Sequence, residues 1–436
     1  MKQTGLSHRR RRRPWPLGAT RAAAVIAAVA LTTSSCAGGA GGSDEGASGE
    51  GFAYGAPQED VDALLTDLDP VEITYQAGAQ SPNSISALSA TSFKEYVEER
   101  SGGKITVDLV YGQAIAGYGE IDDALADGRV DVAYTLPIYK PAEYPVYDAY
   151  LTASGGMPNS IAVGEMIGNA AVVDMGFNSD YLIPEFEEKG LTPLAPMVST
   201  GAHQAVCVDA GTAPEDWKGR QVRIASVAHQ KVASALGASP VSMEYVETFE
   251  ALQRGTVNCT IAQLLPSEEL GLLEIATHVA YMQPENSMSG RAAGATVAGI
   301  GYQRLPLAYQ QIIFDSGATG LGASAELLVE GNVAAVRQLK GAGGEITEID
   351  RQAGDIIGET NASLTAGVEE SGLIGKDLEA RKTDAVEKWT TIVEELGYAD
   401  GGGFNDADEW YDSDEWDFAP YGQRLFEEVA LPHRPS

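Results

Sequence analysis

The segment that decides the fold class is WKGRQVRIASVAHQKVASALGASPVSMEYVETFEALQRGTVNCTI, residues 217–261. Short apolar runs suited to buried strands alternate in it with two helical stretches, which end at Gly237 and Gly255. A strand–helix–strand–helix–strand order predicts an α/β layer with a mainly parallel sheet.

An earlier part of the chain, residues 71–134, repeats this order of elements. Its last part, ALADGRVDVAY (Ala124–Tyr134), matches ALQRGTVNCTI (Ala251–Ile261) at the alanine, leucine, glycine and valine, with Asp131 opposite Asn258. Two similar α/β lobes leave a cleft between them, and ligands of such folds bind beyond the carboxyl ends of strands. We therefore expect two lobes with a ligand site between them.

The N-terminus has the three parts of an export signal. Arg9–Arg13 form a basic stretch, Ala22–Leu31 an apolar run, and small residues follow. Ten apolar residues are too few to span a bilayer. We expect residues 1–35 to be a signal peptide. The arginine run also points weakly to the twin-arginine route, although two nearby prolines disrupt that pattern.

Cys36 stands where a bacterial lipoprotein has its lipidated cysteine, so we expect a lipid anchor on the outer face of the cytoplasmic membrane. Thr33 replaces the large aliphatic residue that usually precedes such a cysteine, and plain secretion remains the alternative. Residues 36–60 are rich in glycine and serine, and this composition predicts a flexible tether. The folded body is expected to begin near Val61.

The charge balance excludes several classes of partner. The chain has 62 acidic and 29 basic residues, and its first 35 residues contain seven of the basic ones and none of the acidic ones. An exported chain this acidic is unsuited to nucleic acid or to anionic lipid. An anionic ligand would need a specific cation. Arg223 is one candidate. Arginine side chains are mostly exposed, however, so an exposed arginine on a polar strand face is the simpler interpretation.

Two stretches carry a family resemblance: EERSGGKITVDLVYGQAIAGYGEIDDALADGRVDVAY, from Glu98, and APEDWKGRQVRIAS, from Ala213, continuing to Gln263. They resemble the solute-binding subunits of TRAP transporters, the DctP-like family, in motif order and spacing. YQRLPLAYQQII, from Tyr302, resembles the next landmark helix of that family. The resemblance covers roughly residues 73–396.

The resemblance implies a two-lobed, periplasmic-binding-protein-like α/β fold. It implies lobe I over residues 61–200 and 275–315, and lobe II over residues 201–274 and 316–436. Such proteins bind a small organic acid and deliver it to a small and a large membrane subunit for ion-gradient-driven import, without a cofactor and without enzymatic activity. A binding protein of an ATP-driven importer or of a sensor system is the alternative.

The resemblance also implies site residues. Arg223 occupies the position that binds the ligand carboxylate, and a guanidinium can hold a carboxylate through two parallel hydrogen bonds. The other candidate ligand-binding residues are Gln76, Leu136, His203, Tyr245 and Gln263, with Ala262 beside the last. Arg223 is the one clear cation among these candidates, and Leu136 and Ala262 are apolar. This set favours a monocarboxylate with an apolar or aromatic body. A dicarboxylate remains possible if His203 is protonated or donates a hydrogen bond.

Cys207 and Cys259 each lie in an apparent strand, and either a disulfide or two buried thiols fits an exported chain. The chain lacks CxxC and HExxH, so no metal site is expected. A hydrolase is disfavoured because GxSxG and Walker A motifs are also missing.

The acidic and aromatic segment 401–423 is the least explained part of the sequence. Asp406, Asp408, Asp412 and Asp414 suggest a calcium loop, but the glycine and glutamate spacing of an EF-hand is missing. We expect its aromatic residues to pack on lobe II and its acids to face water.

Overall fold

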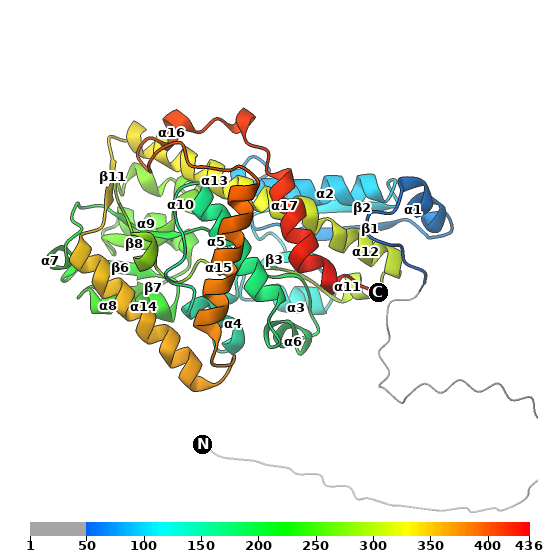
Figure 1. Ribbon diagram of the computed structural model, residues 1–436, viewed down its shortest axis with the longest axis horizontal. Coiled ribbons are helices and arrows are strands. Elements are labelled where there is room, and N and C mark those ends of the chain that lie inside the picture. Colours follow the sequence, from blue (N-terminus) through cyan, green and yellow to red (C-terminus); the bar gives the residue numbers. More distant parts are fainter. Residues whose placement is uncertain (1–48) are drawn as a thin grey trace, which may run out of the picture. The chain divides into compact units, whose positions relative to one another are not determined.

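Two β-sheets organise residues 49–436, the part of the chain that this computed structural model describes (Figure 1). The first sheet has the order β2-β1-β3-β10-β4, with β1 Val71–Gln76, β2 Ile105–Val110, β3 Val132–Thr135, β4 Thr192–Val198 and β10 Gly294–Ala298. The second has the order β11-β9-β5-β8-β6-β7, with β5 His203–Cys207, β6 Gln221–Ile224, β7 Ser239–Ser242, β8 Cys259–Gln263, β9 His278–Tyr281 and β11 Glu345–Glu348. We call the parts built on these sheets lobe I and lobe II.

The expected α/β class is confirmed, and the strands of the two predicted strand–helix units pair in parallel, although each complete sheet is mixed. Strand β10 runs antiparallel to β3 and β4, and β5 runs antiparallel to β8 and β9. The other pairs are parallel. Strands β5 and β10 each follow a crossing of the chain from the other lobe, so no crossover helix constrains them to run parallel to their neighbours.

The two crossings fix the lobe boundaries. The first lies between β4 and β5, close to the expected boundary at residue 200. The second lies between β9 and β10, because β9 pairs with β5 and β11 in lobe II. The expected return to lobe I at residue 275 is therefore too early, because lobe II extends at least to Tyr281.

The helices cover the sheets and join them. Those before or after strands of the first sheet are α1 Gln58–Leu65, α2 Leu88–Arg100, α3 Ile121–Ala126, α4 Pro145–Thr152, α5 Val163–Phe177, α6 Leu182–Glu187, α11 Ile300–Gln303 and α12 Leu307–Asp315. Those of lobe II are α7 Pro214–Trp217, α8 Val227–Ala235, α9 Thr248–Gln253, α10 Leu264–Glu269 and α14 Arg351–Ser371. The remaining ones are α13 Gly317–Gly341, α15 Leu378–Glu395, α16 Ala407–Trp410 and α17 Ala419–Leu425.

Helix α13, yellow in Figure 1, ties the two lobes together. It packs against α2 of lobe I, α10 of lobe II and the C-terminal helix α17. Helix α15 packs against α5, which precedes β4 of lobe I. The segment after residue 316, expected in lobe II alone, therefore contacts both lobes. Residues 307–341 are long and apolar enough to cross a membrane, but 72% of their most apolar window is buried, as in a core helix.

The expected internal repeat appears in the hydrogen bonding of the two matching segments. The Asp131 carboxylate accepts from the Thr74 amide at 2.8 Å, and the Asn258 side-chain oxygen accepts from the Gln221 amide at 3.0 Å. The backbone amides of Asp131 and Asn258 donate to the carbonyls of the same two residues. Each lobe therefore fastens a parallel strand to its neighbour with the same polar side-chain position.

The folded body begins earlier than expected, within the predicted tether. Phe52 lies under the guanidinium of Arg434 at 4.7 Å, and its amide donates to Gln311 at 2.8 Å. The ring of Tyr54 contacts Phe426 with centroids 5.3 Å apart. These aromatic residues dock the end of the glycine-rich segment on the C-terminal helices, so a tether can extend only to about residue 50.

Cys207 and Cys259 lie opposite each other on the antiparallel strands β5 and β8 and form a disulfide. The bond closes a loop with a sequence separation of 52, which restricts the unfolded chain by about 4 kcal/mol in the chain-entropy description. The disulfide thus ties the first strand of lobe II to the strand that carries Gln263 at its end.

Contacts between aromatic rings stabilise the acidic and aromatic C-terminal segment, residues 401–423. Trp416 stacks on Tyr398 and Phe418 and contacts Tyr411. Asp408 pairs with Lys340 of α13 at 2.6 Å. Within residues 49–436, no group of three or more histidine, cysteine or acidic side chains lies close enough together to hold a metal ion.

Candidate functional site: a cavity between the lobes

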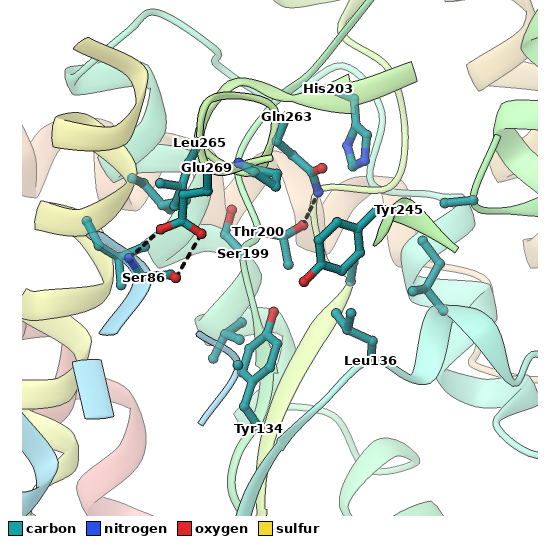
Figure 2. A pocket seen from close by; sticks show the side chains of 18 of the residues that line it. Ser86, Tyr134, Leu136, Ser199, Thr200, His203, Tyr245, Gln263, Leu265 and Glu269 are labelled. Atoms are coloured by element: carbon teal, nitrogen blue, oxygen red, sulfur yellow. Dashed lines mark hydrogen bonds between the residues drawn. The ribbon is translucent and has the colours of Figure 1, made fainter. Parts of the chain in front are cut away.

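A cavity of about 160 Å³ lies between the lobes, where strands of both sheets end (Figure 2). Gly78 follows β1, Leu136 to Tyr139 follow β3, Ala225 follows β6 and Leu265 follows β8. The antiparallel strands contribute from their starts, His203 of β5 and Ala293 before β10. The mixed sheets thus place residues from most strands at one edge of each lobe, where α/β folds bind ligands.

Arg223 lines this cavity near the end of β6 and is only 2% exposed. Its guanidinium donates to the Met243 carbonyl at 3.0 Å, the Ile261 carbonyl at 3.4 Å and the Tyr139 hydroxyl at 3.3 Å. Burial lowers its pKa from the ordinary value, while Tyr139 acts in the opposite direction. The side chain is held in place by neutral acceptors, and the charges of Glu244 and Glu247 act on it without forming an ion pair.

Two other arginines with little exposure, Arg291 and Arg434, each have a carboxylate partner. Arg291 pairs with Glu165 at 2.5 Å, and Arg434 pairs with Asp315 at 2.6 Å. Among residues 49–436, Arg223 has no carboxylate within 4.0 Å of its nitrogens. A buried guanidinium without a counter-ion is costly unless an anion joins it. The geometry suits a ligand carboxylate.

His203 lines the same cavity but supplies no second positive charge. It is 2% exposed, its ring centroid lies 4.5 Å from that of His229, and its Nδ1 has no partner within the described chain. Burial, followed by the neighbouring His229, Arg223 and Arg291, holds the pKa of His203 well below its ordinary value. Burial also lowers the pKa of His229 to about 4. His203 is therefore a neutral imidazole at physiological pH.

Two tyrosines close the cavity across the lobes. The Tyr139 hydroxyl of lobe I accepts from Arg223 and from the Tyr245 amide at 3.2 Å. The Tyr245 hydroxyl accepts from Gln80 of lobe I at 3.2 Å. Figure 2 shows Tyr134 and Tyr245 pointing their hydroxyls into the same space from opposite sides. Tyr245 therefore lines the cavity and links lobe II to lobe I.

A carboxylate also borders the cavity. Glu269 at the end of α10 accepts from the Ser86 amide and the Ser86 hydroxyl, each at 2.9 Å (Figure 2). Ser86 belongs to the 3₁₀ turn Ile85–Ala87 of lobe I, so these bonds join the lobes as well. A negative charge at this wall opposes a second carboxylate on the ligand.

Of the remaining predicted residues, Leu136 and Gln263 line the cavity, whereas Gln76 does not. The Gln76 side-chain oxygen accepts from the Ile115 and Ala116 amides, and its nitrogen donates to the Ala116 carbonyl at 2.8 Å. Gln76 therefore holds the glycine-rich loop 112–119, which brings Tyr118 to the cavity. Ala262 is also absent from the wall, because alternation along β8 turns Gln263 toward the cavity instead.

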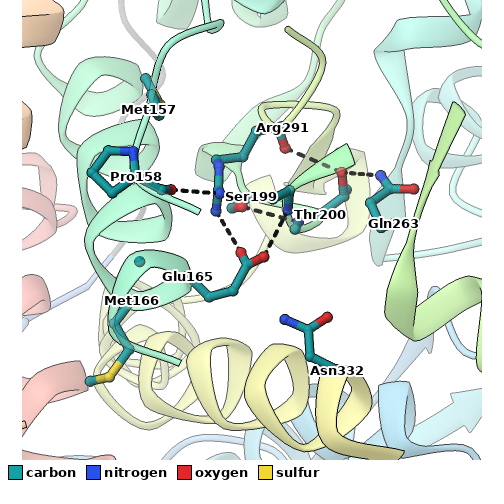
Figure 3. Close-up of polar contacts among 12 residues, drawn as sticks. Met157, Pro158, Glu165, Met166, Ser199, Thr200, Gln263, Arg291 and Asn332 are labelled. Atoms are coloured by element: carbon teal, nitrogen blue, oxygen red, sulfur yellow. Dashed lines mark hydrogen bonds and ion pairs between the residues drawn. The ribbon is translucent and has the colours of Figure 1, made fainter. Parts of the chain in front are cut away.

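A buried ion pair stands behind the cavity wall (Figure 3). Glu165 accepts from Arg291 through one oxygen and from the Ala202 amide at 2.9 Å through the other. The Arg291 carbonyl accepts from the Thr200 amide at 2.8 Å, and the Thr200 hydroxyl accepts from Gln263 at 2.7 Å. The pair therefore fixes the first crossing between the lobes and, through Thr200, orients Gln263.

Sequence reasoning missed several lining side chains that lie in or after strands or, for the last one, at the end of helix α10: Tyr134, Tyr139, Ser199, Thr200 and Glu269. A partial signal existed for Tyr134, which ends the predicted strand before Leu136, since carboxyl ends of strands form ligand sites. Which of these residues point inward depends on how the lobes face each other, and local patterns do not encode that.

Solved structures share this architecture. The structure of a TRAP solute-binding protein from Rhodoferax ferrireducens, in complex with copurified benzoate, is 20% identical with a TM-score of 0.62 and covers 74% of this chain and 99% of that one. A TRAP periplasmic solute-binding protein from Shewanella oneidensis with bound succinate is 18% identical with a TM-score of 0.59 and covers 73% and 99%. At these identities the likeness shows a common fold.

Sequence comparison adds the family. A solute-binding protein of Verminephrobacter eiseniae is 23% identical over 281 residues, which cover 62% of this chain and 76% of that protein. The family model described as bacterial extracellular solute-binding protein, family 7 (DctP), matches residues 77–359. This match spans more than half of the chain and includes Arg223 and the strand ends around the cavity. The chain therefore belongs to the bacterial extracellular solute-binding proteins of family 7.

Proposed function

We propose that this chain is the solute-binding subunit of a TRAP transporter. It captures a small organic carboxylate between its lobes and delivers it to a small and a large membrane subunit for import driven by an ion gradient. The observation that carries the proposal is Arg223, a buried guanidinium in the interlobe cavity with no carboxylate partner in the described chain. The family match favours this over a subunit of an ATP-driven importer or a sensor.

We further propose that the ligand is a monocarboxylate with an apolar or aromatic body. Arg223 is the one cationic side chain among the described cavity residues, His203 is neutral, and Glu269 disfavours a second anionic group. Leu136, Ile138 and Ala293 form an apolar wall. The Rhodoferax ferrireducens protein, copurified with an aromatic monocarboxylate, supports this choice, whereas the succinate-bound relative shows that the fold alone does not impose it.

A thermal-shift and calorimetry screen tests this proposal. We expect aromatic monocarboxylates such as benzoate and phenylacetate to raise the melting temperature, and succinate at the same concentration to raise it less at pH 8 and at pH 6. The shift in melting temperature with succinate should be no larger at pH 6 than at pH 8. The reason is that the pKa of His203 lies well below its ordinary value, so the ring stays neutral at both pH values. Tighter binding of succinate at either pH would contradict the monocarboxylate proposal, and no shift with any carboxylate would contradict the transport proposal.

We also propose that Cys36 is lipidated and anchors the protein to the outer face of the cytoplasmic membrane. Cys36 lies outside the described residues, so the proposal rests on its place after a basic, apolar and small-residue leader. We expect the wild-type chain to incorporate labelled palmitate in bacterial cells and to fractionate with membranes, and Cys36→Ser to lose both properties. Equal labelling of Cys36→Ser and wild type would refute the anchor.

A further inference from the structure

A second cavity of about 100 Å³ adjoins the ligand cavity inside lobe I. It lies between strands of the first sheet and the helices α2, α12 and α13. Its wall is apolar, with Phe93, Phe177, Leu194, Ile313, Phe314 and Leu321 among its residues. None of its described lining residues carries an ammonium, guanidinium or carboxylate group. We call this space the apolar annex.

The annex and the ligand cavity share part of their walls. Ser89, Tyr134, Val198 and Ser324 line both. Two of these are serines, whose side chains are small. The annex therefore adjoins the ligand cavity, separated from it only by these four residues.

Two glycines hold the tyrosine at this junction in place. A Cβ atom at Gly78 would lie 2.6 Å from Tyr134 Cδ1, and a Cβ atom at Gly294 would collide with the Tyr134 hydroxyl. The ring is thus clasped between two backbone segments that only glycine allows so near. Tyr134 therefore cannot move far without displacing one of these segments.

We infer that the annex receives the apolar tail of the ligand, and that the preferred ligand is a monocarboxylate whose aryl or alkyl chain reaches from Arg223 past Tyr134 into lobe I. The inference rests on the proposed carboxylate-binding function and extends it to the far end of the ligand. A dry apolar cavity of about 150 Å³ holds a benzene molecule, so a space of this size takes an alkyl chain or part of an aromatic ring. Its wall offers no partner to a second charge.

Chain length in the ligand tests the inference directly. Calorimetry with benzoate, phenylacetate, 3-phenylpropionate and 4-phenylbutyrate should show affinity rising about 3- to 4-fold for each methylene that places more of the ligand in the annex. A flat or falling series, with benzoate binding well, would overturn the annex inference and leave the proposed function standing. If no member binds, both fail.

Filling the annex provides the complementary test. Gly320 lines the annex on α13, and a Cβ atom there would meet no atom within 4 Å. We expect Gly320→Phe to weaken 4-phenylbutyrate binding at least 10-fold while benzoate binding changes less than 2-fold. Gly341→Phe, at the exposed end of the same helix, is the matched control. Ala195→Leu fills the annex from β4 if the first variant does not fold. Equal effects on both ligands, or none, would overturn the inference.

Discussion

Replacing Arg223 by alanine is expected to weaken carboxylate binding by roughly 30-fold or more. Truncating one partner of a buried, hydrogen-bonded charge pair costs about 2–5 kcal/mol of binding free energy, and each 1.4 kcal/mol is tenfold in Kd. Arg223→Lys should recover only part of this, because an ammonium lacks the planar fork that holds both carboxylate oxygens. Calorimetry with the tightest ligand of the screen measures both variants.

The stability of the ligand-free variant separates this role from a structural one. Arg223 is buried without a carboxylate in the described chain, so removing its charge relieves a desolvation cost. We expect the free energy of unfolding of Arg223→Ala, without ligand, to equal or exceed that of the wild type within about 1 kcal/mol. A variant that unfolds several kcal/mol more easily, or binds carboxylates as well as the wild type, would contradict the assignment.

Replacing Glu165 by glutamine is expected to destabilise the protein by about 3–5 kcal/mol, because it leaves Arg291 charged and buried without its partner. The two side chains are only 2% and 3% exposed. Glutamine keeps the shape of the side chain and loses only the charge. Urea unfolding followed by circular dichroism measures the change in the free energy of unfolding.

An exposed ion pair gives the control for Glu165. Glu250 and Arg254 form a pair one helical turn apart, with side chains 66% and 71% exposed. Glu250→Gln should therefore cost less than about 0.5 kcal/mol. In Glu165→Gln, replacing Arg291 by methionine as well should recover part of the loss, since no buried charge then remains. Equal destabilisation by Glu165→Gln and Glu250→Gln would mean that losing the buried pair costs no more free energy of unfolding than losing the exposed one.

The two arginines illustrate how far sequence reasoning reached. Arg223 stands on a predicted strand and in a motif with a family resemblance, so its place at the cavity was expected. Arg291 follows a loop without a recognisable pattern, and its partner Glu165 lies 126 residues away. No local periodicity links such a pair, and only the packing of α5 against the crossing between the lobes brings the two together.

Gln76 shows a different limit. The sequence correctly places it at the end of the first strand, beside the cavity. Its side chain, however, meets the amides of Ile115 and Ala116 before it reaches the ligand space. The choice between a ligand and a loop as hydrogen-bond partner depends on a distance of a few ångströms between two loops. Turn residues alone do not determine that distance.

By itself, the sequence predicted an export signal, and it determined the α/β class, the repeated strand–helix units and the position of Arg223 near the end of a strand. These follow from local causes: apolar periodicity, glycines that end helices, and residue order within a motif. Only the tertiary structure decided the mixed strand directions, the neutral His203, the tyrosines between the lobes and the apolar annex behind Tyr134. Each of these depends on contacts between segments far apart in the chain, and burial and desolvation follow from such contacts.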